Sequence, residues 1–540
     1  MADVTGSYLF AKALKNEGVD SVFYLMGGPI SPIVGEAEKM GIKAYYVRHE
    51  QAATFAAHAY ARVTGKTGVA ITTAGPGTAN AITGISNAQA DGAPVLLIGG
   101  SSNINTFLQD SFQEMDQLPM FKSISKLAFK AELTARVPEY MSVAFRHAQE
   151  GCKGAVYIDA PGDVINGKVD EAKVWWPTQY RVESRPQGDP AQIRKAVEML
   201  AKAEKPIIVS GSGVLWSEGW DEYKQFVEQT GIPFYTTPQG RGAISDEHPM
   251  MFAGGRTLGF READVVLVLA TRANSMLTNF RAPRWNANAK FIEINIDGKE
   301  LGHNRAVDLG IIADAKQALK QLIEESKGKI KPERYEKWRE TLKKQDEVRA
   351  EKAQTIMNST KVPVHPARLC KELTEAMPRD AYLVVDGHEI MGFSRQTMPI
   401  LKPRHIINAG PMGCMGVGVP FGLGVQAAHP DKPVVVLCGD GAFGWNGMEV
   451  DTAIRHKLPI KIIISNNAGF TGRGTYGMTG RELGWQRYDK MMEAFGGYGE
   501  WVEDPEKIRP AIERALKHDG PALVNVKTDP EARASSAVGF

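Results

Sequence analysis

The chain has 540 residues, more than a single hydrophobic core supports, so about three domains are expected. Its 64 Lys and Arg residues nearly balance 62 Asp and Glu residues, which excludes a strong overall field for a nucleic-acid or membrane partner. No apolar run reaches membrane-spanning length, and the N-terminus opens as an amphipathic helix rather than a targeting signal. The four cysteines, Cys152, Cys370, Cys414 and Cys438, have no metal-ligand spacing, which favours a reducing, cytoplasmic setting.

Short apolar runs alternate with helical patterns along the chain, which is typical of α/β domains with doubly wound parallel sheets. The strand candidates in chain order are VFYLM, AYYV, GVAITTA, PVLLIGG, PIIVSG, DVVLVLA, KFIEINI, YLVVD, PVVVLCG and KIIIS. The polar and aromatic stretch VWWPTQYRVESRPQGDPAQ and a densely charged helical stretch separate them into three blocks. We therefore predict domains at 1–165, 190–325 and 362–540, with a helical linker at 326–361 lying across the outside.

The first block contains a carboxylate at a strand end and a glycine-rich loop. The strand AYYV runs into Arg48, His49 and Glu50, and a helix follows. Taken alone, Glu50 reads as an ordinary strand-terminal carboxylate. The loop TTAGPGTAN, with Gly75, Pro76 and Asn80, equally fits a plain turn before a helix.

The most informative segment lies in the third block, between Val434 and Phe470. A buried strand places Asp440, flanked by glycines, at the carboxyl edge of a parallel sheet, where ligands bind. The helix expected to begin near Ala442 directs its free amides to the same edge, which favours a phosphate. A second buried strand returns Asn467 to this edge. Together with the Gly469 carbonyl, these oxygens suit magnesium shared with a diphosphate.

This segment resembles the thiamine diphosphate fingerprint of the superfamily that includes acetolactate synthase, pyruvate decarboxylase and oxalyl-CoA decarboxylase. The resemblance implies pyrimidine-binding, nucleotide-binding-like middle and diphosphate-binding domains, in that order. It implies that the magnesium ligands are Asp440, Asn467 and the Gly469 carbonyl. The implied cofactor contacts in this segment are Gly439, Asp440, Gly441, Ala442, Phe443 and Asn467. It also implies that Glu50 hydrogen-bonds the aminopyrimidine ring and assists loss of the thiazolium C2 proton.

Two glycine-rich loops also match the superfamily. The loop with Gly75, Pro76 and Asn80 is similar to its glycine-proline-glycine loop at the cofactor. The loop GPMGCMGVG matches a second pattern, in which a bulky apolar residue wedges the two cofactor rings into a bent shape. Met415 takes that place and Gly413 offers a carbonyl, although a methionine among glycines also suits core filling. Since Glu50 and Asp440 lie in different blocks, the resemblance implies a cofactor held between two subunits, in a homodimer or a dimer of dimers.

Within the superfamily, LQDSFQEMDQLPMFKSISKLAFK and YDKMMEAFGG resemble the branch of oxalyl-CoA decarboxylase and the 2-hydroxyacyl-CoA lyases. Both activities start from a coenzyme A thioester and release formyl-CoA. A decarboxylase loses carbon dioxide, whereas a lyase loses an aldehyde or ketone and profits from a base. Glu493 is the candidate base, and it equally fits a solvated helix position. Phe112 stands where the decarboxylase pattern has a tyrosine, which favours the lyase.

The substrate contacts expected from this branch are Phe112, Gln113, Leu127 and Met492 around the acyl group, with Arg256 and Arg473 at phosphates. Relatives of the middle domain hold flavin or ADP, and the sequence leaves open whether ADP or another nucleotide binds here. The favoured function is reversible thiamine diphosphate-dependent cleavage of a 2-hydroxyacyl-CoA to formyl-CoA and a small carbonyl compound. The alternatives are oxalyl-CoA decarboxylase and an acetolactate synthase-like enzyme acting on free 2-oxo acids.

Overall fold

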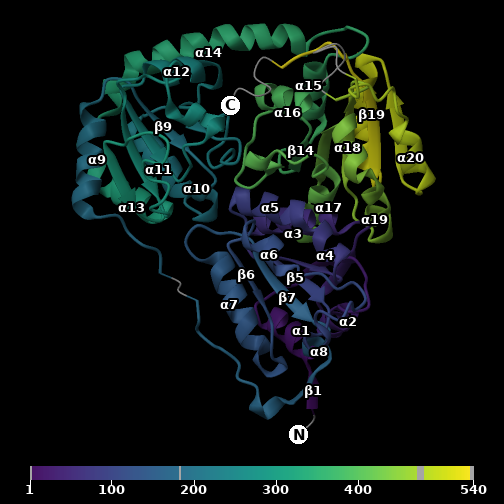
Figure 1. The fold of residues 1–540 in the computed structure, drawn as a ribbon. Coiled ribbons are helices and arrows are strands. Elements are labelled where there is room, and N and C mark those ends of the chain that lie inside the picture. The colour runs from purple at the N-terminus through teal and green to yellow at the C-terminus, as the bar shows by residue number, and fades with distance from the viewer. Residues whose placement is uncertain (1–2, 182–183, 471–478, 535–540) are drawn as a thin grey trace.

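The computed structural model describes residues 3–181, 184–470 and 479–534, which form three α/β domains (Figure 1). Within these ranges, the first and third domains each contain a six-stranded parallel sheet, and the middle domain contains a five-stranded one. Helices cover both faces of each sheet (Figure 1). The predicted fold class is therefore confirmed, and each strand candidate lies on a strand.

The first domain has the sheet order β3-β2-β4-β5-β7-β6. Its strands are β1 (Asp3–Thr5), β2 (Ser21–Tyr24), β3 (Lys43–Tyr46), β4 (Gly68–Thr72), β5 (Val95–Ser101), β6 (Leu127–Lys130), β7 (Val156–Pro161) and β8 (Lys168–Asp170). Its helices are α1 (Gly6–Asn16), α2 (Ser31–Lys39), α3 (Glu50–Thr64), α4 (Pro76–Asn80), α5 (Ile82–Asp91), α6 (Leu118–Lys122), α7 (Val137–Gln149) and α8 (Gly162–Asn166). Antiparallel pairing of β8 with β1 carries this domain to Asp170, slightly beyond the expected boundary at 165.

The middle domain has the sheet order β10-β9-β11-β12-β13. Its strands are β9 (Pro206–Ser210), β10 (Phe234–Thr236), β11 (Val265–Leu269), β12 (Lys290–Asn295) and β13 (Leu309–Ile312). Its helices are α9 (Pro190–Lys202), α10 (Gly213–Trp216), α11 (Trp220–Thr230), α12 (Arg256–Glu262) and α13 (Ala315–Ser326). Ile208 of β9 enters one core, and its neighbours Ile207 and Val209 enter the other. Both faces of the sheet are therefore buried, as the near-continuous apolar runs indicate.

The third domain repeats the strand order of the first, as β15-β14-β16-β17-β19-β18. Its strands are β14 (Tyr382–Asp386), β15 (Ile406–Asn408), β16 (Val434–Gly439), β17 (Lys461–Asn466), β18 (Tyr498–Val502) and β19 (Ala522–Lys527). Its helices are α15 (Pro366–Ala376), α16 (Glu389–Thr397), α17 (Gly418–Ala428), α18 (Asp440–Asn446), α19 (Val450–Arg455), α20 (Tyr488–Ala494) and α21 (Ile508–Lys517). The carboxyl ends of β14, β16 and β17 are adjacent, so the residues that follow these strands share one edge.

Helices α3 and α17 join the first and third domains in a single hydrophobic core. The rings of Phe55 and Phe421 meet edge to face at 5.8 Å between centroids. A Cβ at Gly424 would lie 2.1 Å from the Ala56 carbonyl oxygen, so only glycine allows this approach. The N-terminus of α3, which contains Glu50, is thereby placed against the third domain of the same chain.

The charged stretch after the middle domain forms α14 (Glu336–Met357), which runs along the outside from the middle domain to the third domain (Figure 1). Trp338 and Leu342 are buried beneath it in a middle-domain core, whereas most other side chains of the helix face solvent. Among the residues that the structure describes, no helix combines the length and apolar character needed to cross a membrane.

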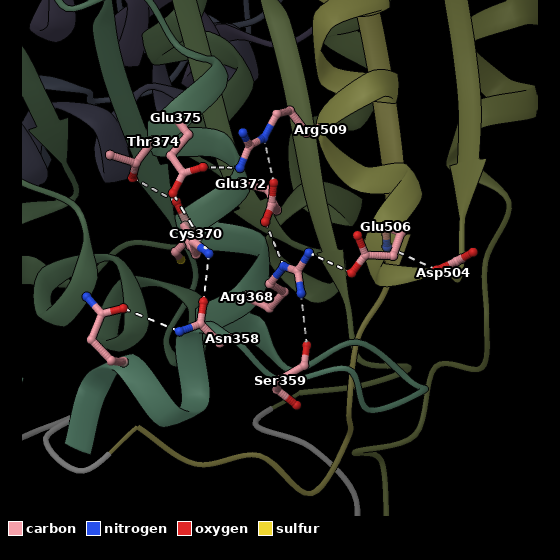
Figure 2. A network of polar contacts seen from close by, with 12 residues as sticks. Asn358, Ser359, Arg368, Cys370, Glu372, Thr374, Glu375, Asp504, Glu506 and Arg509 are labelled. Atoms are coloured by element: carbon pink, nitrogen blue, oxygen red, sulfur yellow. Dashed lines mark hydrogen bonds and ion pairs between the residues drawn. The ribbon is translucent and has the colours of Figure 1, made fainter. Parts of the chain in front are cut away.

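A network of charged side chains fastens the end of α14 and α21 to α15 (Figure 2). The Glu372 carboxylate accepts from Arg368 Nε at 2.6 Å and from Arg509 Nε at 2.7 Å. Arg368 also donates to Glu506 at 3.0 Å and to the Ser359 carbonyl at 3.4 Å, just after α14. Because Glu372 and Arg368 are both buried, each depends on the other for compensation of its charge.

We expect Glu372→Gln to destabilise the third domain by about 2 kcal/mol, because it leaves the buried Arg368 charge incompletely paired. Thermal unfolding of the full chain would show a lower midpoint. The matched control is Glu375→Gln, three residues further along the same helix at an exposed position, where the change should stay within about 0.5 kcal/mol. Equal midpoints for both variants would contradict the structural role of Glu372.

Candidate active site

The sheet edge that is predicted to bind magnesium lies where β16 and β17 end. Asp440 follows β16 and is 1% exposed, and Asn467 follows β17. The Asn467 side-chain amide faces Asp440 Oδ1 at 2.9 Å and the Gly469 carbonyl oxygen at 2.8 Å. Its nitrogen can donate to both. If the Asn467 amide oxygen faces these two atoms instead, three oxygens meet, and only a bound cation would offset their mutual repulsion.

Two further features of Asp440 fit a hard cation. Its second carboxylate oxygen is buried and has no hydrogen-bond partner in the described structure. Burial raises the pKa of Asp440 to about 6, against the opposing effect of main-chain amides such as that of Gly441. A magnesium ion would compensate a charge that is otherwise costly here. Within the described ranges, no three His, Cys, Asp or Glu side chains gather as a metal cluster.

The backbone around Asp440 and Asn467 is tightly packed. A Cβ at Gly469 would lie 2.3 Å from the Arg481 carbonyl oxygen, and one at Gly441 would lie 2.7 Å from the Phe470 ring. Helix α18 begins at Asp440, two residues before the expected Ala442, because an acidic residue is favourable in a first helical turn. Phe443 is buried in the core against the Tyr488 ring rather than open to a ligand through its side chain.

Glu50 is the first residue of α3 and is 6% exposed. Asn80 Nδ2 donates to Glu50 Oε2 at 3.0 Å, so two residues that the resemblance assigns to the cofactor are in contact. A Cβ at Gly77 would lie 3.0 Å from Glu50 Oε1. Gly75 has a φ of 59°, and a Cβ there would lie 2.6 Å from the Gln113 carbonyl oxygen. The glycine-rich loop therefore lies directly against Glu50.

The loop expected to bend the cofactor precedes α17. Met415 is half-buried, Gly413 is exposed, and Gly413 and Gly416 have φ values of 64° and 81°. Asp386, at the end of β14, accepts from the Gly418 amide at 2.8 Å and anchors the end of this loop. Burial raises the pKa of Asp386 to about 6, against the effect of nearby main-chain amides.

Three supporting residues were not identified from the sequence. Asp386 ends the buried strand YLVVD, which is the same signal that marked Asp440. Gln117, inside the quoted branch motif, is 1% exposed and accepts from the Gly75 amide. Glu449 is 1% exposed and accepts from the main-chain amides of Arg48 and His49. No local pattern in the sequence distinguishes Glu449 from an ordinary helix residue.

The residues expected around the acyl group are dispersed in the single chain. Phe112 is 87% exposed, and Gln113 follows it with a φ of 59°. Leu127 packs against a first-domain core, and Met492 is completely buried in the core shared by the first and third domains, which favours a packing role for both. Glu493 is exposed and pairs with Lys490 at 2.8 Å. Arg473 lies outside the described residues.

Arg256 lies among other arginines between the middle and third domains. Its Nε and Nη2 atoms are buried without hydrogen-bond partners in the described structure. Burial, helped by the charges of Arg284 and Arg241, lowers the pKa of Arg256 to about 10. Burial and the charges of Arg241 and Arg256 likewise lower the pKa of Arg395 to about 9. Such a concentration of positive charge favours an anion.

A cavity of about 640 Å³ opens where the carboxyl ends of β9, β11 and β12 face the first domain. Arg181, Arg185, Arg272 and Lys153 line it together with the aromatic ring of Trp216. The Trp216 indole nitrogen is buried and has no hydrogen-bond partner in the described structure. Burial, with help from neighbouring arginines, lowers the pKa of Lys153 to about 8.

Comparisons with known proteins agree with this geometry. Models of the thiamine pyrophosphate enzyme N-terminal TPP binding, central and C-terminal TPP binding domains match residues 4–120, 193–322 and 388–526. Thiamine pyrophosphate is another name for thiamine diphosphate. A 2-hydroxyacyl-CoA lyase of Arabidopsis thaliana is 34% identical, covering 99% of this chain and 97% of its own length. Oxalyl-CoA decarboxylase of Escherichia coli is 29% identical, covering 98% and 96%.

A probable acetolactate synthase large subunit of Methanococcus aeolicus is 31% identical, covering 98% of this chain and 93% of its own length. The chain therefore belongs to the thiamine pyrophosphate enzyme family, in the branch of the 2-hydroxyacyl-CoA lyases and oxalyl-CoA decarboxylases. The predicted family and the expectation of a thiamine diphosphate-dependent carbon–carbon lyase are confirmed.

Proposed function

We propose that the protein reversibly cleaves a 2-hydroxyacyl-CoA to formyl-CoA and an aldehyde or ketone, with thiamine diphosphate and Mg²⁺ as cofactors. The observation that supports the cofactors most directly is the meeting of Asp440, Asn467 and the Gly469 carbonyl at one sheet edge. The identity to 2-hydroxyacyl-CoA lyases supports the substrate class.

We assign a separate role in cofactor binding or proton transfer to each group of site residues. Bound thiamine diphosphate supplies a nucleophilic carbon at C2 and accepts the electron pair that is released when the carbon–carbon bond breaks. Asp440, Asn467 and the Gly469 carbonyl would hold magnesium and with it the diphosphate. Glu50, held by Asn80, would share a proton with the aminopyrimidine ring and so assist loss of the C2 proton. Met415 would support the bent shape of the cofactor, and Glu493 remains the proposed base for the departing hydroxyl.

Phe112 supports the lyase over the decarboxylase. Its ring offers no hydroxyl to a second carboxylate, and both Phe112 and Leu108 are largely exposed, at 87% and 82%. Such a surface suits the alkyl part of an aldehyde or ketone once a neighbouring surface covers it.

The decisive experiment supplies the full-length protein with thiamine diphosphate and Mg²⁺ and follows acyl-CoA species by mass spectrometry. We expect 2-hydroxyacyl-CoA to yield formyl-CoA plus carbonyl product, and formyl-CoA plus a ketone to give the reverse reaction. Efficient release of carbon dioxide from oxalyl-CoA would instead identify a decarboxylase. Turnover of free 2-oxo acids without coenzyme A would identify an acetolactate synthase-like enzyme.

Arg256 is proposed to bind a phosphate of coenzyme A, because its buried guanidinium nitrogens lack partners. We expect Arg256→Met to raise the KM for the acyl-CoA substrate about 10-fold with little change in kcat, since it removes a contact made equally before and during reaction. Steady-state kinetics measure this. The exposed Arg194 provides the control Arg194→Met, and equal KM values for both variants would contradict the assignment.

The cavity beside β9, β11 and β12 is proposed to bind ADP or another nucleotide through Lys153 and its arginines, which share the lining with the carboxylates of Asp91, Glu150, Glu300 and Asp314, and through the Trp216 ring. Since the pKa of Lys153 is about 8, its positive charge is present below that pH and is lost above it. ADP should therefore bind about 3- to 10-fold more weakly at pH 9 than at pH 7, as calorimetry would show, and Lys153→Met should flatten this dependence. Absence of ADP binding at both pH values would contradict the proposal.

We propose that the active unit is a homodimer, assembled further as a dimer of dimers. Large apolar side chains on the elements proposed to hold the cofactor are open in the single chain, namely Leu108, Phe112, Met412 and Trp445. A second copy would cover them and complete the site. The four cysteines all lie within the described residues and are free thiols, which supports the proposed reducing, cytoplasmic setting.

A further inference from the structure

Glu449 of the third domain reaches into the first domain at the turn that leads to Glu50. It ends a short 3₁₀ helix, η8 (Gly447–Glu449), three residues beyond α18. Its Oε1 accepts from the Arg48 amide at 2.9 Å and from the His49 amide at 3.1 Å. Its Oε2 accepts from the Thr452 hydroxyl at 2.6 Å. This 1% exposed carboxylate thus holds two consecutive peptide groups through Oε1 and also binds Thr452 through Oε2.

These two peptide groups are the link between β3 and α3. His49 caps α3, and Glu50 is its first residue, so a shift of the Arg48–His49 backbone would shift Glu50 with it. Asn80 holds the Glu50 carboxylate from the side of the glycine-rich loop. Glu449 of the third domain therefore fixes the backbone next to Glu50, and Asn80 of the first domain holds the Glu50 carboxylate.

The segment that ends at Glu449 also contacts the loop expected to bend the cofactor. Asn446 Nδ2 donates to the Gly416 carbonyl at 2.8 Å and to Gln51 Oε1 at 3.0 Å. One continuous stretch, 440–449, thus begins at the proposed metal ligand, contacts the residue after Met415 and ends at the turn before Glu50. Within one chain its position links these three groups, which in the proposed homodimer would belong to two different cofactor sites.

We propose that Glu449 is a positioning residue, which orients Glu50 for its proton transfer by holding the amides of Arg48 and His49 through charge-assisted hydrogen bonds. The inference rests on the proposed role of Glu50. Burial raises the pKa of Glu449 to about 7, so its charged form, which holds two amides more strongly than a neutral acceptor does, predominates above that pH. A displacement of the order of 1 Å at a catalytic group can cost about 100-fold in rate.

The test measures hydrogen–deuterium exchange at C2 of enzyme-bound thiamine diphosphate, by acid quench and proton NMR of the released cofactor. Exchange needs no acyl-CoA substrate, so it is informative even if the proposed substrate is wrong. We expect Glu449→Ala to slow exchange about 10- to 100-fold, while the Kd for thiamine diphosphate changes less than about 3-fold. Glu449→Gln, which keeps the size of the side chain and one acceptor oxygen, should slow exchange less than Glu449→Ala does.

The matched control is Asp451→Asn. Asp451 lies two residues further on and binds the side chains of Arg455 at 2.8 Å and of the exposed Arg48 at 3.5 Å, but not the Arg48 or His49 amide, so its loss should leave exchange unchanged. Melting curves and circular dichroism confirm that each variant is folded. If Glu449→Ala fails to fold, Glu449→Gln and Glu449→Asp provide the comparison, with slowed exchange in either one expected.

A double-mutant cycle with Glu50→Gln tests whether Glu449 affects C2 exchange through Glu50. If Glu449 acts through Glu50, Glu449→Gln should slow exchange less than about 2-fold further in the Glu50→Gln background. Wild-type exchange in every folded Glu449 variant, or a full additional loss in that background, would overturn the positioning role. Wild-type exchange in Glu50→Gln alone would instead remove the proposed function of Glu50 on which this inference depends.

Discussion

Replacing Glu50 by glutamine should lower kcat by about 100-fold or more while leaving the fold and the cofactor-binding edge intact. The substitution keeps the size of the side chain and a possible contact with Asn80, which donates to Glu50 Oε2 at 3.0 Å. It removes the group that can exchange a proton with the cofactor ring, and general acid–base catalysis commonly contributes about 10²- to 10⁴-fold. Steady-state turnover with saturating thiamine diphosphate and Mg²⁺ measures the effect.

The control for this variant is Glu132→Gln, an exposed carboxylate of the same domain. Its kcat should equal that of the wild type. If Glu50→Gln also retained wild-type turnover, the chain would perform its reaction without this carboxylate, and the assignment of Glu50 would be wrong.

Asp440→Asn should abolish productive cofactor binding and yet leave the cofactor-free protein at least as stable. Asp440 is a proposed magnesium ligand, so the neutral amide should weaken binding of Mg²⁺ with thiamine diphosphate about 100-fold or more. Its carboxylate is buried, one of its oxygens has no partner in the described structure, and burial raises its pKa to about 6. At neutral pH the ionised group therefore costs stability, and asparagine removes that cost.

Thermal unfolding with and without cofactor separates these two effects. A ligand present at 100 times its Kd stabilises a protein by about 2.7 kcal/mol, so the wild type should show a clear rise in melting temperature. Asp440→Asn, with binding weakened about 100-fold or more, should gain at most about 0.4 kcal/mol at the same concentrations, whereas the exposed Asp431→Asn should behave as the wild type. A cofactor-dependent rise of normal size in Asp440→Asn would exclude Asp440 as a ligand.

The sequence predicted those parts of the site that are encoded locally. Asp440 and Asn467 each follow a buried strand, and parallel neighbours end at the same edge, so their meeting follows from the strand order. Asp386 carries the same local signal after YLVVD, and applying the rule to every strand would have found it. For Met492 the motif indicates a substrate contact, which stays a prediction, and the fold places the side chain in a core.

By itself, the sequence determined the α/β class, the three sheets and the family, because these depend on hydrophobic periodicity and on motifs within short segments. Only the tertiary structure decided how distant segments support the site. The packing of α3 on α17 places the Glu449 carboxylate against the amides before Glu50, about 400 residues away in the chain. No local pattern encodes such a contact, since it depends on how the domains pack together rather than on the conformation of either segment.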